Sequence, residues 1–176
     1  MPTWSGTRKK LEEDYLCPAL RGRMRYFATT YRESHDQGMG RAAILVDGTE
    51  ILKSDCVTYF RILWQRARDY RDEQGLDWRE ACRKADKAVL KDGLFDPWCF
   101  YTAFQEFDNQ SIGASLSSEN PIVRIFALLD RRVGKRRLAA LEETMEQELG
   151  WVRPFYLLRM EAEGLRLKSQ KEKDVC

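Results

Sequence analysis

The clearest pattern in the chain is a pair of apolar runs, residues 41–46 and 49–54, separated by Asp47-Gly48. An Asp-Gly pair between such runs favours a two-residue hairpin turn in which both residues have positive φ. Residues 23–32 are rich in aromatic and β-branched side chains and predict another strand. These segments predict a three-stranded antiparallel meander. The cross-strand pairs expected at the turn are Ile44 with Ile51 and Leu45 with Glu50.

On either side of the meander, the apolar spacing changes to that of a helix. Thr3 or Ser5 can cap a first short helix that ends near Cys17-Pro18, and later helices are introduced by capping-box or residue–proline pairs. Gly75 and Gly134 mark helix breaks. The later helices are expected over residues 55–74, 77–91, 98–107, 122–133, 135–149 and 154–163.

The order of these elements indicates the fold class. One helix, three strands and then five or six helices segregate strand from helix, which is typical of an α+β fold. We predict an N-terminal helix and a three-stranded antiparallel meander packed against a mainly helical C-terminal two-thirds. Because no linker is rich in Pro, Gly and Ser, we expect residues 1–164 to form a single domain. Residues 165–176 are expected to be a frayed charged tail.

Composition supports a folded protein. Of 176 residues, 43% are apolar, and eight Phe, seven Tyr and five Trp supply ample material for a core. No stretch reaches the roughly 18 apolar residues of a membrane span, and residues 1–6 lack the apolar run of a signal peptide. The five cysteines form no C-x-x-C pair and are expected to remain reduced. We therefore expect a cytoplasmic protein with no membrane contact.

The motifs of common enzymes are missing. His35 is the single histidine and lies in a polar loop, so neither a His-based triad nor a His/Cys zinc site is expected. Gly134-Lys135 lacks the first glycine and the Ser/Thr of a phosphate-binding loop. The sequence predicts no catalytic residue, no metal ligand and no cofactor.

One arrangement of carboxylates keeps an enzymatic alternative open. Asp47, Glu50 and Lys53 are similar to the Asp…Glu-x-Lys metal site of many nucleases, in which two acids hold Mg²⁺. The spacing here is Glu-x-x-Lys, which puts the two side chains on opposite faces of a regular strand. A metal-dependent nuclease or phosphate-handling enzyme is therefore the alternative function.

The densest charge is a basic cluster that holds five cations within seven residues. If the helix breaks at Gly134, the three cations that follow it begin a new helix. Cations at a helix N-terminus oppose the helix dipole, and a bound anion would offset this unfavourable interaction. The alternative is an internal salt-bridge network with Asp130, next to Arg131, and with downstream acids, Glu142, Glu143, Glu146 and Glu148. The cluster consists of Arg131, Arg132, Lys135, Arg136 and Arg137.

More cations begin the first predicted strand. Alternation places Arg23, Arg25, Phe27 and Tyr31 on one face, and Arg21 extends the cationic end. Cations beside aromatic rings are typical of a platform for single-stranded nucleic acid, where bases stack and arginines meet phosphate. Packing of the two aromatic rings in a core is the alternative.

Several segments of the chain resemble a small, uncharacterised bacterial protein family. The resemblance covers most of the chain and implies a bacterial, cytosolic, single-domain protein, with no activity or site attached. It rests on residues 17–23 (CPALRGR), 31–36 (YRESHD), 46–48 (VDG), 118–124 (SENPIVR) and 128–136 (LLDRRVGKR).

These observations predict a non-enzymatic binding module whose basic surface engages nucleic acid or an acidic protein partner. A homodimer is possible, and a purely structural subunit of a bacterial complex is a further alternative. The residues expected to bind are Arg21, Arg23, Arg25, Arg131, Arg132, Lys135, Arg136 and Arg137.

Overall fold

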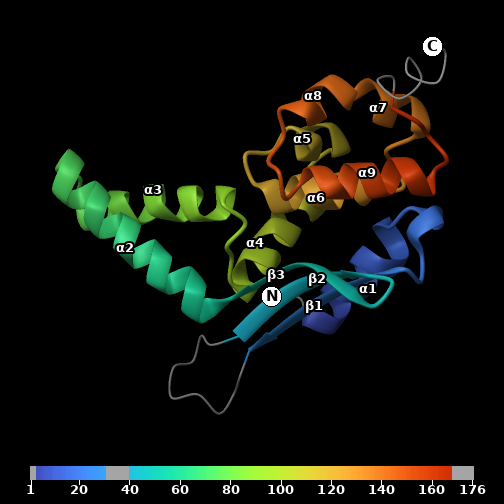
Figure 1. Cartoon of the computed structure of the whole chain (residues 1–176). Coiled ribbons are helices and arrows are strands. Elements are labelled where there is room, and N and C mark those ends of the chain that lie inside the picture. Colours follow the sequence, from blue (N-terminus) through green and yellow to red (C-terminus); the bar gives the residue numbers. More distant parts are fainter. Residues whose placement is uncertain (1–2, 31–39, 168–176) are drawn as a thin grey trace. The chain divides into compact units, whose positions relative to one another are not determined.

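A computed structural model describes residues 3–30 and 40–167 of the chain (Figure 1). It confirms the α+β class, with an N-terminal helix, a three-stranded antiparallel sheet and a mainly helical remainder. In chain order the elements are α1 (Trp4–Lys9), the π-helix η1 (Lys10–Tyr15), the 3-10 helix η2 (Pro18–Leu20), β1 (Met24–Thr30), β2 (Gly40–Val46), β3 (Thr49–Asp55), α2 (Cys56–Gln74), α3 (Trp78–Lys91), α4 (Pro97–Asp108), α5 (Ile112–Leu116), α6 (Pro121–Leu129), α7 (Lys135–Ala140), α8 (Glu142–Glu146) and α9 (Arg153–Ala162).

The chain divides into two compact units. The sheet unit comprises Arg25–Thr102, and the helical unit comprises Met1–Met24 with Ala103–Cys176. β1 and α4 carry the chain from one unit to the other. The expectation that residues 1–164 form a single domain therefore stays a prediction.

Three features discussed from the sequence lie outside the described residues. They are Tyr31, His35 and the tail from residue 168.

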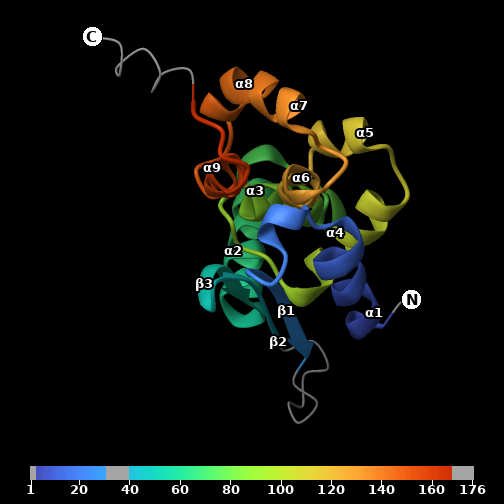
Figure 2. The same ribbon diagram turned by 90° about the vertical axis from the view of Figure 1, so that its right-hand side faces the viewer.

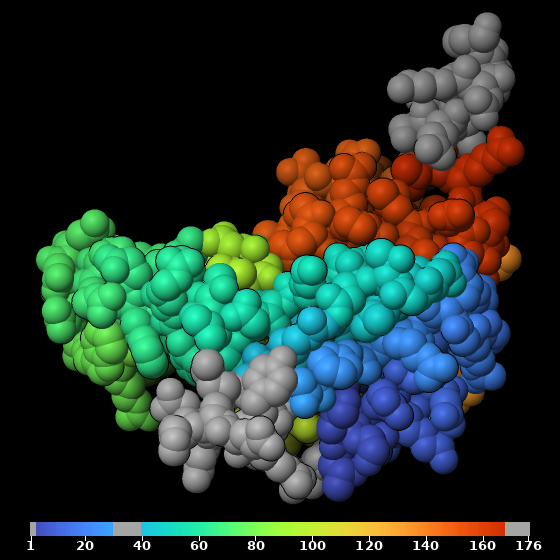
Figure 3. Space-filling model, turned by 60° about the horizontal axis from the view of Figure 1, so that its bottom comes forward, coloured from blue at the N-terminus to red at the C-terminus, as the bar shows by residue number. Residues whose placement is uncertain are grey.

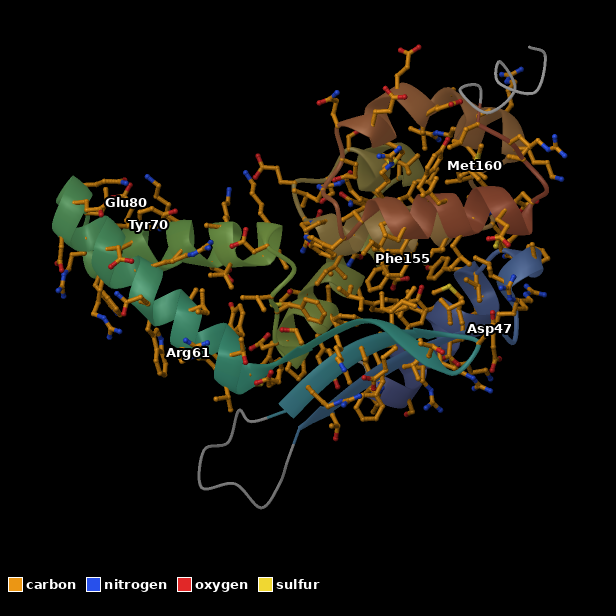
Figure 4. The ribbon with its side chains drawn as sticks, in the orientation of Figure 1. Asp47, Arg61, Tyr70, Glu80, Phe155 and Met160 are labelled. Atoms are coloured by element: carbon orange, nitrogen blue, oxygen red, sulfur yellow. The ribbon has the colours of Figure 1, made fainter. Side chains whose placement is uncertain are left out.

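The sheet has the order β1-β2-β3, and the predicted turn joins β2 to β3. Asp47 and Gly48 have φ of 49° and 82°, as a two-residue hairpin turn requires (Figure 4). Leu45 faces Glu50 as predicted, but the pairing of Ile44 with Ile51 is wrong. A bulge at Ile51 places Leu52 opposite Ile44.

The rest of the sheet unit is dominated by the antiparallel pair α2 and α3, which follows β3 directly (Figure 1). Asp55 caps α2 by accepting from the Thr58 amide at 2.9 Å, and Asp77 caps α3 by accepting from the Glu80 amide at 3.0 Å. The capping-box pattern at residues 77–80 predicts the second cap, whereas the sequence left Ser54 and Asp55 as alternatives for the first. The core between the helices contains Tyr59, Leu63, Ala67, Ala81, Ala85 and Val89.

The helical unit is built around α6, most of whose residues are buried. α6 packs against α5 and α9, and Figure 2 shows it between them. Figure 4 labels Phe155 and Met160, through which α9 contributes to the core. Among the residues that the structure describes, no helix is both long and apolar enough to cross a bilayer.

Two of the predicted helices are shorter than expected. The helix expected over residues 122–133 ends at Leu129, because Asp130 adopts extended backbone and pairs with Leu16 in an isolated antiparallel bridge. The helix expected over residues 135–149 divides into α7 and α8 at Leu141. The predicted break at Gly134 is present, where Gly134 is the N-cap of α7.

Candidate functional site

The basic cluster follows α6 on a segment whose backbone is held by residues far away in the sequence. The Cys17 amide donates to the Leu129 carbonyl at 2.9 Å, and the Arg131 amide donates to the Tyr15 carbonyl at 2.7 Å. These bonds join the segment to the N-terminal part of the helical unit. The direction in which each cation leaves the backbone is therefore set by the fold.

Asp130 and Arg132 form an internal pair. The Asp130 carboxylate is fully buried, accepts from the Arg132 amide at 2.6 Å and forms an ion pair with its guanidinium at 2.7 Å. The guanidinium also lies over the rings of Tyr15 and Phe107, at 4.9 and 5.4 Å from their centroids. Arg132 therefore stabilises the segment through contacts within the helical unit.

A second, partly buried contact extends this packing. The Tyr15 hydroxyl donates to the Asp108 carboxylate, which also accepts from Lys10 Nζ at 3.0 Å. Burial and, after it, the hydrogen bond to Asp108 together raise the pKa of Tyr15 to about 12. Although burial alone raises the pKa of Asp108, the hydrogen bonds from Tyr15 and Lys10 lower it overall.

Arg159, on α9, also holds the segment in place and is not among the residues predicted to bind. Its side chain is 2% exposed and donates to the carbonyls of Leu129, Asp130 and Val133 at 3.0, 3.1 and 2.9 Å. It also forms an ion pair with Glu163 at 3.1 Å. A signal was present, because Arg159 lies four residues after the buried Phe155 and so shares the apolar face of α9.

Lys135 joins the same network. Its Nζ donates to the Glu163 carbonyl at 2.8 Å and lies 3.7 Å from the Glu163 carboxylate. An internal network therefore exists for part of the cluster. Its acids are Asp130, which was expected beside Arg131 and pairs with Arg132, and Glu163, which was not expected. Of the downstream glutamates expected in this role, Glu148 instead pairs with Arg124, at 2.7 Å.

All five cations of the cluster are exposed, and the other three differ from Arg132 and Lys135 in having no partner among the described residues. Arg131, Arg136 and Arg137 are exposed, and none of them has an ion-pair or hydrogen-bond partner for its side chain within residues 3–30 and 40–167. Arg137 Nη2 lies 3.2 Å from the position that a Cβ on Gly113 would take, so its guanidinium lies beside α5. We call Arg131, Arg136 and Arg137 the free arginine set.

The N-terminal arginines are divided between the two units. Arg21 donates to the Glu13 carbonyl at 3.1 Å, and the structure also gives Arg23 an interaction partner. Both belong to the helical unit. Arg25 belongs to the sheet unit and also has an interaction partner. Arg21 and Arg23 therefore share a unit with the free arginine set, whereas Arg25 does not, and a common binding site for all of them stays a prediction.

The predicted aromatic platform on β1 is only partly formed by described residues. Phe27 is 39% exposed, so its packing in a core is excluded. The Arg41 guanidinium covers its ring at 5.2 Å and pairs with Glu50. A base that stacks on this face of the ring would have to displace Arg41, and Tyr31 lies outside the described residues.

The three residues of the nuclease alternative lie at the β2–β3 hairpin. Glu50 and Lys53 are on the same face, with Lys53 Nζ 3.8 Å from the Glu50 carboxylate, because the extra residue at the Ile51 bulge shifts the alternation of faces by one position. Our expectation of opposite faces was wrong for this reason. Glu50 is held between Lys53 and Arg41, two cations that compete with a metal ion for its oxygens. Within the described residues, no three His, Cys, Asp or Glu side chains gather closely enough to hold a metal.

These features define an α+β protein that presents a rigidly held basic segment next to a helical core. The chain belongs to the SF0329 protein family, whose model matches residues 3–160. The predicted resemblance to an uncharacterised family is thereby confirmed, while its bacterial origin stays a prediction. The chain has no significant match among curated proteins or among solved structures.

Proposed function

We propose that this protein is a non-enzymatic binding module that contacts the phosphate backbone of a nucleic acid through the free arginine set. The observation that carries the proposal is the division of the basic cluster. Arg132 and Lys135 have acidic partners inside the helical unit, whereas Arg131, Arg136 and Arg137 are exposed without one among the described residues. Three unpaired guanidinium groups on a short segment favour a polyanionic ligand.

The surroundings of the free arginine set favour phosphate over an acidic protein. No acid lies between Arg131 and Leu141. None of the large hydrophobic side chains that are exposed in the described residues lies in residues 130–140. Protein interfaces draw most of their affinity from buried apolar and aromatic anchors, whereas phosphate contacts do not need them.

The held backbone favours binding as well. The segment is ordered by the Tyr15 carbonyl, by Asp130 and by Arg159, so a ligand would not have to order it. Arg132 and Lys135 support the site by fixing the backbone, while Asp130 and Glu163 offset their charge.

The test is fluorescence anisotropy with labelled single- and double-stranded DNA and RNA of mixed sequence across a salt series. We expect salt-steep binding by the wild-type protein. In the R131A/R136A/R137A variant, the slope of log K against log salt should fall by about 2 to 3 because three phosphate contacts are lost.

The matched control is R8A/R79A/R83A, which removes three other exposed arginines that have no partner among the described residues. It changes the net charge by the same amount and should leave the slope close to wild type. If the two variants lose affinity equally, the effect is one of total charge and the site is not the free arginine set. Absence of binding at low salt would refute nucleic acid as the ligand and favour an acidic protein.

A further inference from the structure

α2 presents a second exposed surface, on the face opposite to α3. One face of α2 contributes Tyr59, Leu63 and Ala67 to the core of the sheet unit. The opposite face carries residues at the spacing i, i+4, i+7 and i+11, which aligns them along about 16 Å of helix. We call this the outer stripe of α2, and it consists of Val57, Arg61, Trp64 and Arg68.

The outer stripe contains two apolar anchors. Val57 is 55% exposed and Trp64 is 51% exposed. The Trp64 indole stacks on Phe60, with the ring centroids 5.5 Å apart and the planes 28° apart. Phe60 in turn packs against the core between α2 and α3. The indole is therefore held in place while half of it stays exposed, which lowers the entropy lost when a partner covers it.

The same stripe carries two cations that flank the indole. Arg61 precedes Trp64 by three residues, and its side chain has no partner in the part of the chain that the structure describes. Arg68 follows by four residues and donates to the Gln65 side chain at 3.1 Å. Figure 4 shows Arg61 projecting from α2 away from α3, and Figure 3 shows the surface of α2 in teal to green.

We infer that the outer stripe of α2 docks an acidic amphipathic helix of a partner protein. Exposed Trp and Arg are the residue types most enriched at the energetic centres of protein interfaces. A straight stripe with helical spacing matches the face of a second helix. A partner helix needs apolar residues to cover Val57 and Trp64, and carboxylates on its flanks to meet the two arginines.

Charge and symmetry argue against the two other occupants. In a symmetric dimer the same stripe meets itself, so Arg61 of one copy would approach Arg68 of the other. A nucleic acid would gain little from the aliphatic Val57, and one face of the Trp64 indole is already covered by Phe60. The outer stripe thus differs in kind from the free arginine set, which has charge without apolar anchors.

The test uses the full chain and two fluorescein-labelled helical peptides of about 18 residues, or five turns. Both carry Leu along one face; one has Glu on the flanks and the other has Lys. We expect the Glu peptide to bind more tightly than the Lys peptide by anisotropy. W64A should weaken the Glu peptide at least about tenfold, as expected for an interface anchor.

Charge reversal gives the sharper result. R61E/R68E should weaken the Glu peptide about tenfold and strengthen the Lys peptide. The control R79E/R83E makes the same charge change on exposed positions of α3 and should leave both affinities within about twofold. Because all substituted residues are exposed, circular dichroism and thermal unfolding should show each variant folded as the wild type.

Several results would overturn the inference. These are equal affinity for the two peptides, no binding of either, or an equal effect of R79E/R83E and R61E/R68E. A Trp64-dependent dimer, or single-stranded DNA that binds only when Trp64 is present, would assign the stripe to another occupant. R131A/R136A/R137A should not change peptide binding, so failure of this inference and failure of the proposed function are distinguishable.

Discussion

At the scale of single residues, the fate of each arginine depends on the groups that the fold brings to it. Arg132, Arg159 and Arg131 lie within one helical unit, yet the first is stacked and paired, the second is buried and the third is exposed. A guanidinium in water gains little from one exposed acid, whereas a buried one must satisfy its donors or destabilise the fold. Only arginines that are both exposed and without an internal partner are fully available to a ligand.

Arg159 gives a direct test of this distinction. Replacing it with Leu leaves the carbonyls of Leu129, Asp130 and Val133 without their buried donor, and should lower the free energy of unfolding by about 3 kcal/mol. Arg159→Lys keeps the charge but lacks the planar fork, so it should recover part of the loss.

Urea unfolding at neutral pH measures both variants. Arg153→Leu is the control, because Arg153 is exposed on the same helix. Its effect should stay within about 0.5 kcal/mol. An Arg159→Leu protein as stable as this control would mean that the buried hydrogen bonds contribute nothing to stability.

At the scale of elements, local signals specified the helix starts and the hairpin turn, and long-range contacts specified several of the ends. Asp55 and Asp77 cap the helices that follow them by accepting hydrogen bonds from amides three residues later. Such short-range caps leave a recognisable pattern in the local sequence. The end of α6 at Leu129 depends on Leu16, more than a hundred residues away. The bulge at Ile51 depends on how β3 pairs with β2, and no residue type within β3 announces it.

Two glycines at helix boundaries differ in backbone conformation, so replacing each with Ala distinguishes the cost of conformational strain from the cost of crowding. Gly75 ends α2 with φ of 64°, which an L-residue adopts at a cost, so Gly75→Ala should destabilise the protein by about 1 kcal/mol. Gly134 has φ of −76° and free space where a Cβ would lie.

Gly134→Ala should therefore change stability by less than about 0.5 kcal/mol. The midpoint of thermal or urea unfolding compares the two variants with wild type. Equal effects of the two substitutions would contradict the assignment of strain to the left-handed position.

At the scale of the whole molecule, each compact unit is joined by contacts that the sequence does not display. In the helical unit, the N-terminal segment meets residues 103–167 through the Leu16–Asp130 bridge and the hydrogen bond from Tyr15 to Asp108. In the sheet unit, α2 and α3 bury one face and leave the outer stripe open. The two proposed binding surfaces therefore belong to different units and differ in chemistry.

The Tyr15–Asp108 contact predicts a dependence of stability on pH. The folded state raises the pKa of Tyr15 to about 12, whereas tyrosine in an unfolded chain titrates near 10. The folded state therefore holds this proton more tightly. Its contribution to stability is fully present below about pH 10 and is lost as the pH rises toward 12.

Tyr15→Phe should lower the free energy of unfolding by about 1 kcal/mol at pH 8, because the hydrogen bond to Asp108 is lost. The difference between wild type and variant should shrink as the pH rises from 10 to 12. Urea unfolding of both proteins across this range measures it. A difference that stays constant with pH would show that Tyr15 does not titrate differently in the folded state.

The amino-acid sequence alone specified the fold class, the hairpin turn, the principal helix starts and the location of the densest positive charge. Each of these follows from side chains a few residues apart, through capping, turn conformation or apolar periodicity. The sequence did not reveal which cations of the cluster are free, the burial of Arg159, the shared face of Glu50 and Lys53, or the exposure of Phe27. Those properties required the three-dimensional fold, because burial and pairing depend on groups that meet only after distant segments have packed together.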